Sequence, residues 1–327
     1  MEPLSSTPTT ASAGFELPAA GFAPTATDAF DATPTAVAVP KRSRRGLVVI
    51  VLLAVALLAA LAVLALALVG LQQANATIKD QNQQLDKQRQ LIDKKETFSA
   101  TMQSLLKTAS ALDGVRLGEL VPISHYQAIA TQAWYHRADA SAIQGDIQEA
   151  KDAQADLEAL QAAAVTQAST NASGTAYEAT IDALGGGYVS SSLDDADAIC
   201  ERDVLACVTG DDPYTVHFDA KELGVPYLTD FIQTGTAYHE FAHSLQFTNP
   251  DQTETAVAAF GGDVETMADC FALTYLDGWA LHQEVFVSST TYYEVDLGYG
   301  YTCNDDQKAV IRTWYESLPI TVGEISQ

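Results

Sequence analysis

The longest apolar run of the chain covers residues 46–70, where Leu, Ala and Val dominate and no side chain is charged. At about 1.5 Å per residue, a helix of this length crosses a hydrocarbon layer of about 30 Å. A basic cluster directly precedes the run, and none follows it: Lys41, Arg42, Arg44, Arg45. We predict a single transmembrane helix at residues 46–70, with the N-terminus in the cytoplasm and the remainder of the chain outside the cell membrane.

A cleaved signal peptide is the alternative interpretation of this run, because Ala74, Asn75 and Ala76 resemble a cleavage site. The apolar core of a signal peptide spans about 7 to 15 residues, so the greater length here favours an uncleaved anchor. Residues 1–45 are rich in Pro, Thr, Ala and Ser and lack periodic apolar positions. Because such a segment buries too little surface to offset the entropy of ordering, we predict a disordered cytoplasmic tail.

Apolar positions continue at helical spacing after the run. One series repeats every seven residues: Leu71, Ile78, Leu85, Ile92. A second series starts at Leu91 and continues from Phe98 with alternating steps of four and three: Leu91, Phe98, Met102, Leu105, Ala109, Leu112. The spacing predicts a helical stalk. The complementary heptad positions are Ala74, Gln81, Gln88 and Lys95, which suit a self-sufficient parallel dimer poorly. We therefore expect the stalk to pair with a neighbouring helix.

A second long helix is predicted over residues 125–167, which are rich in Ala, Gln and Asp and follow breaks at Asp113-Gly114 and Pro122. Folded back on the first helix, it gives an extracellular helical stalk or hairpin over residues 71–168. His125 and His136 lie eleven positions apart in it, with no carboxylate at ligand spacing. We interpret both as surface histidines.

The densest chemistry lies in His239-Glu240-Phe241-Ala242-His243. Residues 227–247 contain no proline and repeat apolar side chains at helical spacing, and Asn249-Pro250 supplies a stop, so the motif lies on a predicted helix. Two imidazoles four positions apart on a helix point the same way and can bind one Zn²⁺, with the intervening carboxylate as a base.

A catalytic zinc site needs a third protein ligand, and Glu265 is the downstream candidate. Asp269 is four positions later on the same predicted helix face, where it can accept a hydrogen bond from the outer nitrogen of a ligand imidazole. The alternative is that both carboxylates belong to a solvated helix face. Their position after the paired histidines favours the metal site.

This region resembles the gluzincin class of zinc metallopeptidases, in particular bacterial neutral zinc metallopeptidases with an HExxHxxQ helix and an ExxADCxA segment. Gln246 and Cys270-Phe271-Ala272 fit that pattern over about the last 95 residues. The resemblance implies one Zn²⁺ held by His239, His243 and Glu265, with Glu240 as the catalytic base and Asp269 beside the ligands. Leu273 replaces the usual glycine, so substrate preference does not carry over. Gln246 and Asn249 occupy positions that metzincins fill with glycine and histidine, which excludes that class.

The function that follows is a membrane-anchored, zinc-dependent endopeptidase acting on a peptide or protein substrate, with Glu240 moving the proton of an attacking water to the leaving amine. An oxyanion donor is also needed, and the candidates are His282, Tyr292, Tyr293, Tyr299 and Tyr301. The alternative function is a catalytically silent surface binding or assembly protein built on a metallopeptidase-like scaffold. Hydrolysis of an unbiased peptide library would distinguish the two.

The expected fold class is mainly α, with an α+β catalytic module that is zincin-like and contains a small sheet. A Ser-, Thr-, Asn- and Gly-rich stretch over residues 167–187 marks the start of this module, which we place at residues 169–327. Residues 214–219 alternate like a strand, and strands beside the active-site helix commonly hold extended substrates. His217 in that strand is interpreted as structural.

Four cysteines lie only in the outer region, which suits an oxidising compartment. Proximity in sequence favours a Cys200–Cys207 disulfide and leaves Cys270 to pair with Cys303, although free buried thiols remain the alternative. The net charge is −25, from 17 basic and 42 acidic residues, and charges within residues 1–45 cancel. So acidic an outer region excludes nucleic acid as an expected partner. The sequence leaves the oligomeric state open.

Overall fold

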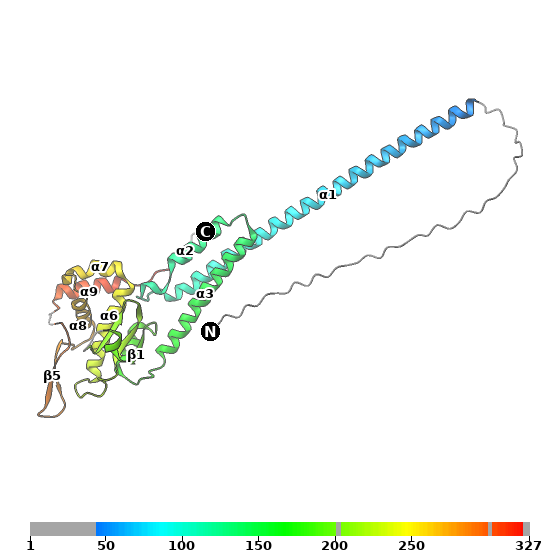
Figure 1. Ribbon diagram of the computed structural model, residues 1–327. Coiled ribbons are helices and arrows are strands. Elements are labelled where there is room, and N and C mark those ends of the chain that lie inside the picture. The colour runs from blue at the N-terminus through cyan, green and yellow to red at the C-terminus, as the bar shows by residue number, and fades with distance from the viewer. Residues whose placement is uncertain (1–43, 201–203, 300–302, 323–327) are drawn as a thin grey trace, which may run out of the picture. The chain divides into compact units, whose positions relative to one another are not determined.

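The computed structural model describes residues 44–200, 204–299 and 303–322 (Figure 1). Two compact units are distinguished, Met1–Ala76 and Thr77–Gln327. The chain is mainly helical and contains two small sheets. The predicted disordered tail, apart from Arg44 and Arg45 at the start of the first helix, lies outside the described residues.

Helix α1 (Arg44–Ala109) is continuous and contains the predicted anchor. Among the described residues it is the one helix long and apolar enough to cross a membrane. Its heptad residues Leu71, Ile78, Leu85 and Ile92 are 49–61% exposed, so the expected pairing with a neighbouring helix is not present at these positions. From Met102 onward the apolar face of α1 is buried.

Two helices, α2 (Ile123–Tyr135) and α3 (Ala140–Ala168), replace the single helix expected over residues 125–167. The physical reason is the cap at Asp139, whose carboxylate accepts hydrogen bonds from the backbone N–H groups of Ser141 and Ala142 and so begins a new helix. His136 ends α2, and its Nδ1 lies 2.9 Å from an oxygen of the buried Asp146. The two helices and the end of α1 share a small apolar core: Met102, Leu105, Ala109, Leu112, Tyr126, Ile129, Ala150, Leu157.

The segment between α1 and α2 is anchored to the C-terminal part of the chain. It contains two short 3₁₀ helices, Ser110–Leu112 and Gly118–Leu120. The backbone N–H of Ile320 donates to the carbonyl of Val115 at 2.7 Å, and the Arg116 guanidinium lies 4.1 Å from the ring centre of Tyr315. Leu117 and Leu120 enter the main core. The segment therefore packs as part of the domain that carries the candidate site.

The main sheet has the order β1-β3-β2, from β1 (Ser190–Asp194), β2 (Ala206–Thr209) and β3 (Asp212–Asp219). Strand β3 confirms the strand expected at residues 214–219; it runs parallel to β1 and antiparallel to β2. Helix α4 (Ala176–Gly185) lies in the stretch that the sequence suggested was a boundary, and the Tyr177 ring stacks on Phe218 at 3.9 Å. A short helix, α5 (Ala196–Ile199), follows β1.

The remaining elements surround the central helix α6 (Asp230–Thr248). They are α7 (Pro250–Val257), a 3₁₀ turn (Ala258–Phe260), α8 (Val264–Tyr275), the hairpin of β4 (His282–Phe286) and β5 (Tyr292–Asp296), and α9 (Asp305–Ser317). Disulfides join Cys200 to Cys207 and Cys270 to Cys303, the pairing expected from the sequence. The second one ties α8 to the segment just before α9.

Candidate metal centre

Helices α6 and α8 supply the candidate ligands. Thr229 caps α6 by accepting a hydrogen bond from the backbone N–H of Ile232, and Pro250 starts the next helix just after α6 ends. Asp263 caps α8 in the same way, and this places Glu265 in the first helical turn. Because α6 carries its two histidines one turn apart, both rings can face the start of α8.

Three ligand atoms converge between these helices. The Nε2 atoms of His239 and His243 lie 3.1 Å apart, and each lies 3.1 Å from Oε2 of Glu265. This group of three could hold a metal ion. A tetrahedral Zn²⁺ with ligands at about 2.0–2.1 Å keeps its ligand atoms about 3.3–3.4 Å apart, so the observed triangle is close to the required size.

The outer nitrogen of each imidazole is oriented by an acceptor. Nδ1 of His239 lies 2.9 Å from Oδ1 of Asp269, and Nδ1 of His243 lies 2.8 Å from Oε1 of Gln246. Gln246 donates through Nε2 to the carbonyl of Val264, which fixes its oxygen toward the histidine. With a cation bound, both Nδ1 atoms would carry the proton and both Nε2 lone pairs would point to the shared centre. The donor set and its orientation fit a bound cation.

Asp269 also anchors the loop that follows β5. The carboxylate is only 2% exposed, and its Oδ2 accepts a hydrogen bond from the backbone N–H of Tyr299 at 3.0 Å. A Cβ at Gly298 would lie 2.7 Å from the same oxygen, so glycine is needed for the loop to approach this closely. One carboxylate thus orients His239 and holds Tyr299 over the site.

The electrostatics of the site favour a positive charge. Burial alone would lower the pKa of His239, but hydrogen bonds to Asp269 and Glu265 outweigh it and raise this pKa to about 10. Burial acts to raise the pKa of Glu265, yet hydrogen bonds to the two imidazoles bring it well below its usual range. Three carboxylates, those of Glu240, Glu265 and Asp269, therefore lie close to two imidazoles. A divalent cation would offset the negative charge of these carboxylates.

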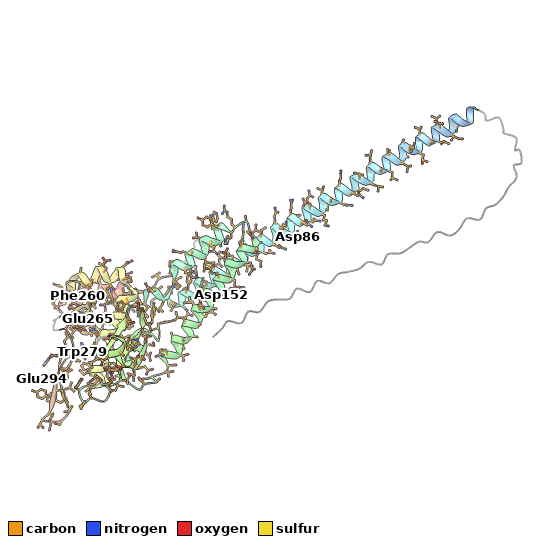
Figure 2. The ribbon with its side chains drawn as sticks, viewed as in Figure 1. Asp86, Asp152, Phe260, Glu265, Trp279 and Glu294 are labelled. Atoms are coloured by element: carbon orange, nitrogen blue, oxygen red, sulfur yellow. A yellow bond between two sulfur atoms is a disulfide. The ribbon has the colours of Figure 1, made fainter. Side chains whose placement is uncertain are left out.

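A cavity of about 220 Å³ opens beside His239 and is lined by Glu240, which is 6% exposed, and by Thr236 and Trp279. Figure 2 labels Trp279 and Glu265 in this part of the domain. Burial raises the pKa of Glu240 above its ordinary value. No Lys or Arg lines this cavity among the described residues.

Tyr299 is the tyrosine that reaches the site. Its ring stacks on His239 with centres 6.1 Å apart, and it lines the cavity. Burial, with the neighbouring carboxylates of Glu265 and Glu240, raises the pKa of Tyr299 to about 12, and the phenol donates a hydrogen bond to Glu265.

The other oxyanion candidates do not line the cavity. His282 pairs with Asp296 at 2.8 Å, Tyr292 is 46% exposed, and Tyr293 lies against Tyr227 with ring centres 5.9 Å apart. All three lie on the β4–β5 hairpin, whose existence the sequence pattern did not reveal. Tyr301 lies outside the described residues.

The sheet bears on two further expectations. Strand β3 lies between β1 and β2, so both of its edges are already paired and it cannot accept a substrate strand. The edge strand β2 begins at Ala206, which lines the cavity. His217 in β3 pairs with Asp194 through Nδ1 at 2.9 Å, which agrees with the structural role expected for it.

Gln246 is the functional residue whose role the motif alone did not reveal. It lies three positions after His243, a spacing that puts both side chains on one helix face.

Comparison of the chain with protein-family models, curated proteins and solved structures finds no match in any of the three.

Proposed function

We propose that this chain is a membrane-anchored, zinc-dependent endopeptidase of the gluzincin type. The observation that carries the proposal is the convergence of His239, His243 and Glu265 within 3.1 Å of one another, with Glu240 lining the adjacent cavity. A bound Zn²⁺ would polarise the scissile carbonyl and lower the pKa of a water molecule. The resemblance of the two helical motifs to neutral zinc metallopeptidases points in the same direction.

Glu240 is the proton carrier in this proposal. Its carboxylate accepts a proton from the attacking water and then delivers it to the leaving amine, which is general base and general acid work by one group. Glu240 is buried and lines the cavity beside His239, which places its carboxylate where it can take up and release this proton.

Tyr299 is the proposed donor to the developing oxyanion. Its side chain lines the cavity beside His239, and its backbone is held by Asp269. An extended substrate would pair with the edge of β2 that no other strand of the described residues covers, since Ala206 of β2 lines the cavity. Asp269 and Gln246 act through the imidazoles that they orient.

The proposed location follows from the charge pattern around the apolar run. Residues 46–70 anchor the chain in the cell membrane, the basic cluster keeps residues 1–45 in the cytoplasm, and the peptidase acts outside. Two disulfides in the region after the anchor support an oxidising compartment.

The test is hydrolysis of an unbiased peptide library by the full chain and by Glu240→Gln, with bound zinc measured in both. We expect zinc in both proteins and loss of cleavage only in the variant, since Glu240 is not among the ligands. Equal cleavage by the variant would refute the mechanism. Bound zinc without cleavage by the unaltered chain would instead favour the silent binding protein.

A further inference from the structure

The β4–β5 hairpin has one face that no other part of the described chain covers. Because side chains alternate along a strand, three cross-strand pairs share this face and all six residues are exposed: Phe286 with Tyr292, Glu284 with Glu294, and His282 with Asp296. Figure 2 labels Glu294 on the hairpin.

The opposite face holds the hairpin against the domain. Val285 and Leu297 pack on the main core, and the Tyr293 ring contacts that of Tyr227. At the base, the backbone N–H of Leu297 donates to the carbonyl of Leu281 at 2.7 Å. The outward face is therefore presented in a fixed position relative to the cavity.

The outward face combines an exposed aromatic pair with a pair of like charges. Phe286 and Tyr292 form an aromatic pair with ring centres 5.3 Å apart, yet they are 63% and 46% exposed. Glu284 lies directly opposite Glu294, an arrangement of like charges that destabilises a strand pair. Among the described residues, neither glutamate has an ion pair with a Lys or Arg. A cation between the glutamates would relieve their repulsion.

The same face leads into the candidate site. Strand β5 ends at Asp296, and Asp296, Leu297, Gly298 and Tyr299 line the cavity beside His239. Asp296 and both glutamates also act on His282, since the hydrogen bond to Asp296 and the charges of Glu294 and Glu284 raise the pKa of this imidazole. The outward face thus has a negative field that continues to the mouth of the cavity.

We propose that this hairpin face docks a positively charged, partly apolar segment of the polypeptide substrate outside the scissile region. A lysine or arginine lies between Glu284 and Glu294, and an apolar side chain packs on Phe286 and Tyr292. From Tyr292 to Asp296, an extended segment of about four residues covers the face at about 3.4 Å per residue. The identification of the docked segment as substrate rests on the proposed peptidase function.

A lipid surface is the other partner that exposed aromatic side chains can fit. The three carboxylates beside the aromatic pair oppose it, because the anionic headgroups of a membrane repel them. Charge complementarity therefore favours a cationic peptide.

Binding to the full chain carrying Glu240→Gln tests the docking separately from catalysis. The probe is a fluorescent peptide of alternating lysine and leucine, compared with its glutamate-for-lysine counterpart by anisotropy at low salt. We expect Glu284→Gln with Glu294→Gln to weaken binding of the lysine peptide about fivefold. Phe286→Ser with Tyr292→Ser should weaken it by a similar factor. The matched control, Glu254→Gln with Glu316→Gln, changes the net charge equally at exposed positions elsewhere and should leave binding unchanged.

Equal weakening by the control pair, or equal binding of the two peptides, would overturn the docking site. If the unaltered chain binds anionic vesicles more tightly than the chain with Phe286→Ser and Tyr292→Ser, the partner of this face is a lipid surface. This result would also overturn the peptide docking site. Cleavage of short peptides that do not reach the hairpin reports the proposed function independently. Hairpin-dependent binding without any cleavage would therefore refute the peptidase and leave the docking site standing.

Discussion

At the scale of single residues, the site depends on side chains that orient the ligands as much as on the ligands themselves. Asp269 and Gln246 accept hydrogen bonds from the Nδ1 atoms of the two imidazoles. This orientation leaves both Nε2 atoms available to bind a cation together with Glu265. Gln246 does this with an oxygen whose direction is set by its own hydrogen bond to Val264. The amide therefore supports the candidate metal site without being one of its ligands.

Replacing this amide gives the first prediction. Gln246→Leu should lower zinc affinity about 10- to 100-fold, because the His243 ring loses the acceptor that fixes its tautomer. Gln252→Leu, at an exposed position on α7, should leave affinity unchanged. Competition with a zinc-chelating dye measures both, and equal affinities in the two variants would contradict the role assigned to Gln246.

The second prediction concerns Tyr299. Tyr299→Phe should lower kcat by about 100-fold while zinc content stays the same, since removing one oxyanion donor costs roughly this much in other enzymes. Steady-state kinetics on a cleaved peptide and elemental analysis give the two readouts. An unchanged kcat would move the donor role to another group, and loss of zinc would show that the phenol supports the ligands instead.

At the scale of elements, α6 is positioned by close packing at its first half. Gly235 faces Trp279 so closely that a Cβ would lie 2.1–2.3 Å from atoms of the indole ring, and this ring also contacts Phe231. A larger side chain at position 235, one helical turn before His239, would therefore displace Trp279, which lines the cavity.

The third prediction follows from that packing. Gly235→Ala should destabilise the fold by about 1–3 kcal/mol, the usual cost of overpacking. Gly145→Ala in α3 is the matched control, because nothing lies within 4 Å of the added Cβ, and it should stabilise by about 0.5–1 kcal/mol. Urea unfolding measures both free energies, and similar effects in the two variants would contradict the contact with Trp279.

The fourth prediction concerns the turn between α3 and α4. Burial would raise the pKa of Glu178, but hydrogen bonds from Ser173 and the Ala172 backbone lower it from its ordinary value of 4.5. A lowered folded-state pKa stabilises the fold above pH 4.5, and this contribution is lost as pH falls below that value. Glu178→Gln should thus destabilise the protein by about 1 kcal/mol at pH 7 and by less in acid. A pH-independent difference in urea unfolding would contradict it.

Some elements could be predicted from a local sequence pattern alone, and others could not. The paired histidines could be predicted because one uninterrupted helix fixes their spacing, and the strand at residues 214–219 could be predicted from its alternation. The break between α2 and α3 could be recognised only from the cap at Asp139, since Ala and Gln continue on both sides. Helix α4 could not be predicted, because the Ser- and Gly-rich residues around it are typical of a loop. Tyr299 reaches His239 through a loop held by Asp269, a tertiary contact that no local pattern encodes.

At the scale of the whole molecule, the chain combines an apolar helix, a strongly acidic region after residue 45 and a candidate metal site. The charge of −25 belongs to residues after 45, and no Lys or Arg is present in the hairpin, residues 282–296, or among the described residues that line the cavity. Cationic polypeptides are the partners that such a surface attracts most rapidly. A membrane anchor would confine this attraction to the cell surface.

The most direct test of the account is X-ray absorption at the zinc edge of the purified full chain after dialysis against zinc-free buffer. The account predicts one zinc per chain with nitrogen and oxygen neighbours at about 2.0–2.1 Å, two of them imidazoles, and loss of this signal in Glu265→Ala. A chain that retains no zinc, or zinc with sulfur neighbours at about 2.3 Å, would contradict it.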